Sequence, residues 1–329
     1  PSGDCVALEN EAINGGASLS GCYTVASTLT VNDGVLTIEA GTELTFAQDV
    51  GFEVGANAGL VIAGTVEAPV TFKGLEQERG YWKGLRFNDS DSPQNSISHL
   101  TLTHAGSSAW TGDPASSGGI YISGENNNLE ISDSTFSENA AVAVHAQGGD
   151  SDVTIASSSF TNNDASLWLH ANLTGGLSDD LTFEGNDDGH IHTSINGASE
   201  SVSREQTWPA LTEPYLVRRT IKLDALLALS PGSRLEFEQD VGIDISDEGR
   251  LSAVGTEASP ITFTGAEEER GFWKGLYYHD TRSSQNVLEH VAITHAGSDG
   301  WTGGAQSRGC IYIAGDGVAL KIASADFQE

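Results

Sequence analysis

The chain has little positive charge: 15 Lys and Arg stand against 46 Asp and Glu among its 329 residues, a formal net charge of −31. Affinity for nucleic acid depends mainly on Lys and Arg that neutralise phosphates, and anionic membrane surfaces attract the same cations. We therefore expect neither nucleic acid nor an anionic membrane among its partners. Because charged residues make up only 19% and hydrophobic residues 38% of the chain, it is not a disordered acidic tail, and we expect it to fold.

The chain also has no methionine, only three cysteines and no long apolar run. No stretch approaches the roughly 18 to 20 consecutive apolar residues of a membrane span, and residues 1–4 lack the charged and apolar regions of a signal peptide. The absence of Met indicates a processed or trimmed chain. Cys5 and Cys22 can close a small loop, the alternative being free thiols, and Cys310 is alone. A Cys5–Cys22 disulfide would indicate an oxidising compartment, so we predict an extracellular or cell-surface location.

A long repeat is present instead. The segment that starts at Phe46 returns at Phe237, an offset of 191 residues that holds without a gap through the second copy. On this register Glu329 corresponds to Glu138, so the second copy stops early and we expect the chain to be a piece of something longer. We divide the chain into an N-terminal cap, a first copy and a truncated second copy, continuous in one solenoid. These domains are residues 1–28, 29–207 and 208–329.

A shorter period lies within each copy. Three phenylalanines recur at spacings of 24 and 23 residues, and an asparagine follows each of them three residues later. The pairs are Phe136 with Asn139, Phe160 with Asn163, and Phe183 with Asn186. Short runs of alternating polarity, typical of half-buried strands, are separated by Gly, Asn, Asp and Ser. No run of about 10 to 12 residues has the spacing of a helix.

This pattern predicts an all-β fold, a parallel β-helix with three strands per coil. Each coil of about 24 residues would supply one strand to each of three parallel sheets, and the asparagines would stack at one corner. A pair of β-sandwich domains is the alternative, and Asp33-Gly34 and Asp316-Gly317 suit its hairpin turns. A sandwich leaves the 24-residue spacing and the asparagines unexplained, so we favour the solenoid.

The residues also resemble a known family. Residues 36–46 (Leu-Thr-Ile-Glu-Ala-Gly-Thr-Glu-Leu-Thr-Phe), 60–65 and 69–72 look like secreted or surface-attached bacterial proteins with right-handed parallel β-helix repeats, of the pectin-lyase-like superfamily, and the likeness returns at 251–255 and 260–263. The resemblance implies a right-handed solenoid. It says little about function, since this fold carries lyases, hydrolases, adhesins and passive stalks alike.

Enzymes of this superfamily need residues that are scarce here. Lyases of this kind combine Ca²⁺-binding carboxylates with a Lys or Arg base, and hydrolases combine acidic residues about 6.5 to 9.5 Å apart with His and an Arg-Ile-Lys motif. Residues 186–192 (Asn-Asp-Asp-Gly-His-Ile-His) resemble part of the hydrolase set, but the Arg-Ile-Lys motif is missing. We therefore assign no catalytic residue and no cofactor. We interpret Asp187 and Asp188 as solvated turn residues, with a Ca²⁺ site there as the alternative.

Four of the six Trp fall in two loop segments that both copies share. In the structural interpretation, Trp82 and Trp273 cover backbone where a loop departs, Glu78 pairs with Arg79 or Lys83, and His104 caps a strand end through a backbone hydrogen bond. In the functional interpretation, aromatic faces stack on a sugar ring while nearby polar groups bind its hydroxyls. The candidate ligand-binding residues are Glu78, Arg79, Tyr81, His104 and Trp110 in the first copy and Glu269, Arg270, Phe272, His295 and Trp301 in the second.

The favoured function is accordingly a non-enzymatic spacer or adhesion module, with a polysaccharide or cell-surface glycan as partner. A polysaccharide lyase or glycoside hydrolase is the first alternative. A self-assembling subunit is the second, because the end of a parallel solenoid exposes strand edges that can pair with another chain, end to end or at a surface.

Overall fold

The computed structural model describes residues 5–10, 13–195, 197 and 199–328. Short strands dominate these ranges, and paired strands run parallel to one another. No helix in the described part of the chain has the length and apolar character needed to cross a membrane.

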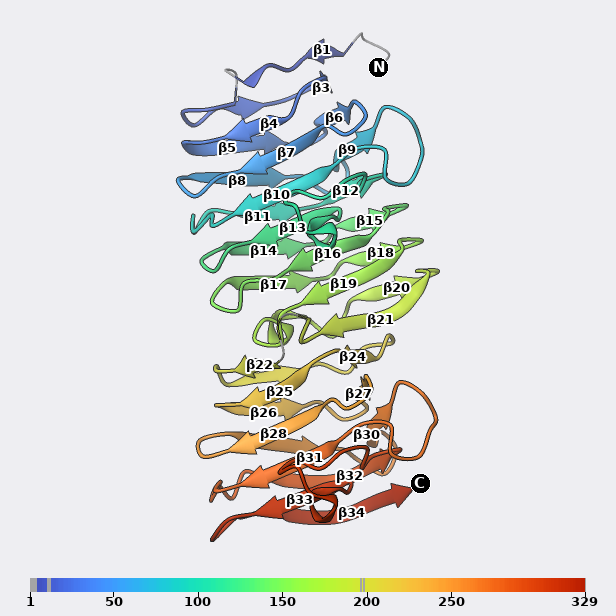
Figure 1. Cartoon of the computed structure of the whole chain (residues 1–329). Helices are drawn as coiled ribbons and strands as arrows, with labels where there is room; N and C mark the ends of the chain where they lie inside the picture. Colours follow the sequence, from blue (N-terminus) through green and yellow to red (C-terminus); the bar gives the residue numbers. More distant parts are fainter. Residues whose placement is uncertain (1–4, 11–12, 196, 198, 329) are drawn as a thin grey trace. The chain divides into compact units, whose positions relative to one another are not determined.

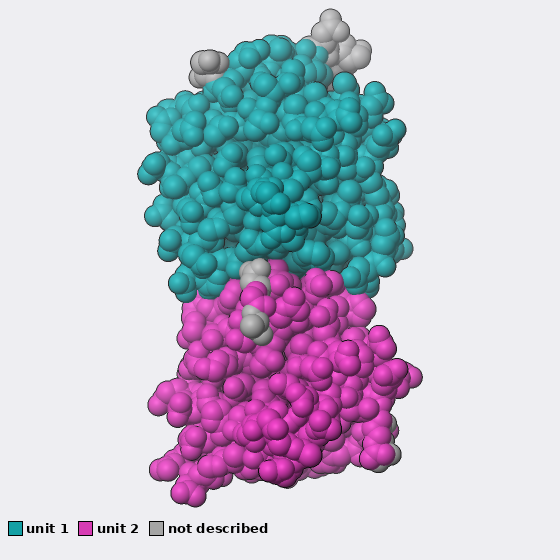
Figure 2. Space-filling view, viewed as in Figure 1, with its two compact units in different colours: residues 1–168, 180–189 teal, residues 169–179, 190–329 magenta. Residues whose placement is uncertain are grey.

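The chain divides into two compact units (Figure 2). Unit 1 comprises residues 1–168 and 180–189, and unit 2 comprises residues 169–179 and 190–329. This division follows packing, whereas the boundary expected between residues 207 and 208 follows sequence similarity. The two boundaries therefore differ, and the expected continuity of the copies stays a prediction.

Unit 1 is built from three parallel sheets, and each complete coil gives one strand to each sheet (Figure 1). The first sheet contains β1 (Val6–Ala7), β3 (Cys22–Val25), β6 (Glu43–Phe46), β9 (Val70–Gly74), β12 (Leu100–Thr103), β15 (Thr135–Ser137), β18 (Ser159–Thr161) and β20 (Thr182–Glu184). The second contains β2 (Ser18–Leu19), β5 (Gly34–Glu39), β8 (Ala58–Ala63), β11 (Ser96–Ser98), β14 (Asn128–Ser132) and β17 (Asp152–Ala156). The third contains β4 (Leu29–Val31), β7 (Gly51–Val54), β10 (Gly84–Asn88), β13 (Ile120–Ser123), β16 (Val142–Ala146) and most of β19 (Ala165–Leu169).

Unit 2 repeats this arrangement in three columns of parallel strands (Figure 1). The first column contains β22 (Ser199–Val202), β25 (Thr220–Leu223), β28 (Gly242–Ser246), β31 (Gly275–His279) and β33 (Ile311–Ala314). The second contains β23 (Gln206–Trp208), β26 (Leu226–Leu229) and β29 (Arg250–Val254). The third contains most of β21 (Asp188–Thr193), together with β24 (Tyr215–Val217), β27 (Arg234–Phe237) and β30 (Ile261–Gly265). The long β32 (Val287–Thr294) joins the second and third columns, because it pairs with both β29 and β30, and β34 (Lys321–Gln328) pairs along its length.

Alternating side chains explain why these segments become strands. In β17 the outward residues are exposed while Val153 and Ile155 are buried, as expected for a strand with one face on a core. Corners between strands need a sharp change of direction, and His99 and His290 supply it with left-handed backbone at φ 51° and 49°. The expectation of an all-β, right-handed parallel β-helix with three strands per coil is confirmed.

The asparagine corner of unit 1 is also confirmed. The side-chain amide of Asn139 donates to Asn163 Oδ1 at 2.8 Å, and that of Asn163 donates to Asn186 Oδ1 at 3.1 Å. Beside them the rings of Phe136, Phe160 and Phe183 stack with centroids 5.2 and 5.5 Å apart. Within these three coils, each coil therefore aligns the next through one amide and one ring.

The cysteines lie at opposite ends of the sequence. Cys5 and Cys22 form a disulfide within unit 1. Cys310, in unit 2, is a free thiol, and its partial burial raises its pKa.

Candidate functional site

A tryptophan loop covers the same sheet surface in both units. In unit 1 the loop runs between β12 and β13, and in unit 2 between β32 and β33. Each loop contains a single 3-10 turn, η2 (Pro114–Ser116) or η4 (Ala305–Ser307), held by a buried serine. Ser116 Oγ accepts from Thr111 N at 2.9 Å, and Ser307 Oγ accepts from Thr302 N at 3.1 Å. The same hydrogen bond to a buried serine hydroxyl therefore shapes both loops.

The loop places its indole on the outer face of the sheet. Trp110 lies against Gly51 of β7, and Trp301 lies against Gly242 of β28. A Cβ at either glycine would clash with the indole, so the close approach requires glycine at both positions. We call the outer surfaces of β7, β10 and β13 in unit 1 and of β28, β31 and β33 in unit 2 the site faces.

A lysine ammonium lies over each indole. Lys83 Nζ is 4.7 Å from the Trp110 ring centroid, and Lys274 Nζ is 5.2 Å from that of Trp301. Such cation–π contacts are attractive by about 0.5–1 kcal/mol at exposed sites. The lysine thus helps to hold the indole on the site face, and both side chains remain partly exposed.

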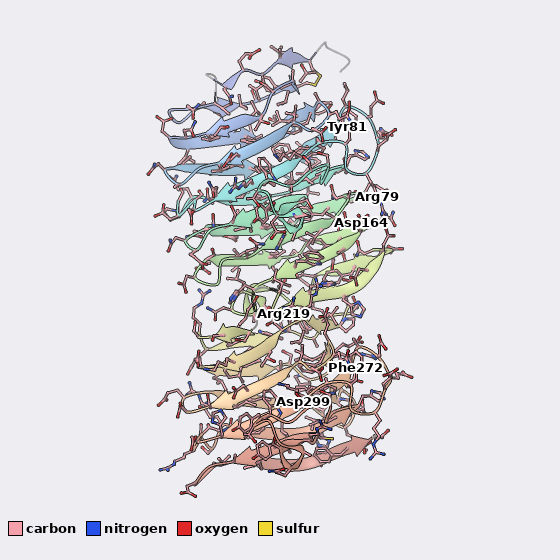
Figure 3. The ribbon with its side chains drawn as sticks, in the orientation of Figure 1. Arg79, Tyr81, Asp164, Arg219, Phe272 and Asp299 are labelled. Atoms are coloured by element: carbon pink, nitrogen blue, oxygen red, sulfur yellow. A yellow bond between two sulfur atoms is a disulfide. The ribbon has the colours of Figure 1, made fainter. Side chains whose placement is uncertain are left out.

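Two of the predicted aromatic residues lie elsewhere. Tyr81 packs against Gly74 at the base of the loop between β9 and β10. Phe272 packs against Gly265 in the same way, at the base of the loop between β30 and β31. Figure 3 shows both on the right-hand side of the view. Trp82 and Trp273 are fully buried and stack on Phe46 and Phe237 with centroids 4.1 Å apart. These residues belong to the core or the loop base rather than to the site faces.

Within each unit, the backbone of one histidine connects the tryptophan loop to the loop that precedes β10 or β31. The carbonyl of His104 accepts from Tyr81 N at 2.8 Å, and that of His295 accepts from Phe272 N at 2.7 Å. Both residues have left-handed backbone, at φ 64° and 60°. The imidazole of His104 contacts Thr103 Oγ1 at 3.0 Å, and burial lowers its pKa. These contacts position the loops.

Arg79 corrects one expectation. In the structural interpretation Glu78 pairs with Arg79 or Lys83. The Arg79 guanidinium instead contacts acidic residues of three successive coils: Glu138 at 3.5 Å, Asp164 at 3.0 Å and Asp187 at 2.7 Å. Figure 3 shows Arg79 beside Asp164. Burial opposes the charge on Arg79, but the hydrogen bonds and charges of these aspartates outweigh it and raise its pKa.

The side chain of Asp187, interpreted from the sequence as a solvated turn residue, is 65% exposed and also contacts Arg79. One group of three metal-binding side chains occurs among the described residues, namely Cys5, Cys22 and Glu43. Its two sulfurs form the disulfide, so they are not available as ligands. The Ca²⁺ site at Asp187 and Asp188 stays an alternative without added support.

The structure thus separates the predicted residues into groups. Trp110 and Trp301 lie on the site faces, Arg79 lies on a column of carboxylates, and Tyr81, His104, Phe272 and His295 hold the loop bases. Glu78, Glu269 and Arg270 are exposed.

Residues beneath the tryptophan loops were missed by sequence reasoning. In unit 1 the floor of the site face centres on Arg86, which donates to Ser123 Oγ and Asn88 Oδ1 at 3.0 Å each and pairs with Glu53 at 3.3 Å. Tyr121 lies on the next strand, with the Arg86 Cζ 6.0 Å from its ring centroid. The alternation of outward residues in these strands was the signal that could have found them.

In unit 2 the floor is aromatic. The Tyr277 ring stacks with those of His279, Trp301 and Tyr312, with centroids 4.3, 5.2 and 5.2 Å apart. His279 Nε2 contacts Asp244 Oδ1 at 2.8 Å. Flat apolar rings next to a carboxylate and an imidazole can hold a ligand with one apolar face and several hydroxyl groups.

Comparison with known proteins agrees with the fold. Residues 58–202 match the family model described as the right handed beta helix region. No curated protein and no solved structure matches this chain. The class supported by the sheets and this match is the parallel β-helix protein.

Proposed function

We propose that this chain is a non-catalytic, extracellular or cell-surface β-solenoid that serves as a spacer or adhesion module and binds carbohydrate at its site faces. The observation that carries the proposal is the duplicated placement of an indole, a lysine and a glycine. Trp110 with Lys83 and Gly51 recurs as Trp301 with Lys274 and Gly242.

The local chemistry suits sugars. A sugar ring offers a C–H face that packs on aromatic rings, and hydroxyl groups that bind carboxylates, imidazoles and ammonium groups. The acidic surface disfavours uronates and sulfated glycans, since the chain carries a net charge of −31. Neutral polysaccharides are therefore the proposed partners, and the Cys5–Cys22 disulfide supports an oxidising, extracellular compartment.

The test is binding to a panel of immobilised neutral polysaccharides. Replacing both Trp110 and Trp301 by Ala should weaken binding by about tenfold or more, since stacked rings are lost from both site faces. Glu130→Gln is the matched control, because this exposed residue of β14 lies on another sheet. If the double variant keeps its fold, judged by circular dichroism, and binds like the parent chain, carbohydrate binding at the loops is refuted.

An enzyme is the second candidate, on account of one acid–base pair in unit 2. His190 Nε2 contacts Glu236 Oε2 at 3.1 Å on the outer face of β21 and β27. Burial opposes ionisation of Glu236, but His190 and Arg234 outweigh it and lower its pKa. Release of unsaturated or reducing ends from the same polysaccharides, lost in Glu236→Gln, would favour a lyase or hydrolase over the binding module.

A further inference from the structure

The two site faces share a frame but differ in their floors. The frame is the glycine, lysine and tryptophan described above, together with Tyr121 in unit 1 and Tyr312 in unit 2. At the offset of 191 residues, the floor changes from Arg86 to Tyr277 and from Asn88 to His279. A common frame with an altered floor is the expected result when a duplicated site changes its ligand preference.

The floor of unit 1 has its hydrogen-bonding capacity occupied. The guanidinium of Arg86 donates hydrogen bonds to Ser123 and Asn88 and pairs with Glu53, and the Arg86 side chain is 15% exposed. Tyr121 is buried, and its hydroxyl donates to Gln147 Oε1 at 2.7 Å. This face therefore offers a ligand the partly exposed Trp110 and Lys83 but little further aromatic surface.

The floor of unit 2 presents several rings at once. Tyr277 and Trp301 are each partly exposed and lie with Tyr312 within one stacked cluster. The pair of His279 and Asp244 borders this cluster, with side chains 26% and 20% exposed. Both imidazole nitrogens contact carboxylates, Nε2 that of Asp244 and Nδ1 that of Asp280, and these carboxylates offer acceptors to the hydroxyl groups of a sugar.

We infer that the two faces are not equivalent: the Tyr277 face of unit 2 is the principal site for neutral sugar rings, and residues 86/277 and 88/279 determine the difference. This inference rests on the proposed function and adds its location and selectivity. Asp244 and Asp280 beside the cluster disfavour an anionic sugar at this face.

The experiment is calorimetric titration of the whole chain with neutral oligosaccharides: cello-, xylo-, manno- and chito-oligosaccharides. The parent chain should show one stronger site per chain. Tyr277→Arg, which installs the residue of unit 1, should weaken that site by about tenfold, whereas Tyr277→Phe keeps the ring and should stay within about fivefold. The reciprocal double variant Arg86→Tyr with Asn88→His should add a second site of similar affinity.

Each alternative outcome has a distinct meaning. Two sites of equal affinity in the parent chain would overturn the inference and leave the proposed function standing. The same conclusion would follow if a folded Tyr277→Arg variant bound normally while loss of Trp110 and Trp301 abolished binding. If the reciprocal variant folds but gains no second site, the floor residues do not determine selectivity, and the inference fails. Binding of none of these oligosaccharides and none of the polysaccharides would overturn both proposals. Far-ultraviolet circular dichroism and the urea midpoint, compared with Glu130→Gln, establish that each variant is folded.

Discussion

Replacing Asn163 by Ala should strongly destabilise unit 1. The Asn163 side chain is fully buried and makes four hydrogen bonds. Its Oδ1 accepts from the backbone N–H and the side-chain amide of Asn139, at 3.1 and 2.8 Å. Its amide donates to the Phe136 carbonyl at 3.0 Å and to Asn186 Oδ1 at 3.1 Å. The substitution therefore removes the links between three coils at one corner.

The magnitude follows from the groups left behind. A buried polar group without a partner costs about 1–3 kcal/mol, and each further lost hydrogen bond costs about 0.5–1.5 kcal/mol. The backbone N–H of Asn139 has no room to reach water, so we expect the free energy of unfolding to fall by about 3–5 kcal/mol. This is a large part of the roughly 5–15 kcal/mol that stabilises a typical protein.

Urea unfolding followed by circular dichroism measures the change, and hydrogen exchange at residues 136–163 shows whether the loss is local. Asn32→Ala is the control, because Asn32 is exposed and should change stability by no more than about 0.5 kcal/mol. A loss below about 1 kcal/mol for Asn163→Ala, with the same urea dependence, would refute the structural role given to the asparagine ladder.

Three further predictions concern other parts of unit 1. Arg79→Ala should lower the free energy of unfolding by about 1 kcal/mol in low salt and by less in 1 M NaCl, because its ion pairs are partly exposed and screened by salt. A loss of stability that grows with salt in urea titrations would contradict this prediction. Trp82→Ala should lower the free energy of unfolding by about 3–5 kcal/mol because the ring is fully buried. Trp110→Ala should lower it by less than half as much. Equal losses in thermal unfolding would argue against the separation of core and site-face indoles. His145 is buried, and burial lowers its pKa to about 4. Its unfolded pKa is about 6.5, so the unfolded state binds more protons between these values and stability should fall by about 3 kcal/mol as pH decreases from about 6.5 to 4. His145→Gln should flatten this dependence in urea titrations at each pH.

The stacking of coils was predictable because its signals are local and repeated. A strand buries alternate residues, and one coil returns the chain to the same corner after about 24 residues, so Phe136, Asn139 and their repeats mark the core and a corner directly. The 191-residue offset likewise revealed that Trp110 and Trp301 occupy matching loops. The direction of each loop was undetermined, since Gly, Ser and Thr allow many paths.

The sequence by itself therefore determined the class of fold, the asparagine corner and the duplication. The tertiary structure decided which side chains meet across coils: Arg79 contacts Asp164 and Asp187, which lie 85 and 108 residues away, and Tyr277 stacks on Trp301 and Tyr312. Such contacts depend on where a loop folds back over neighbouring strands. That path is set by glycine clearance, loop turns and packing summed over several coils, and no local periodicity encodes it.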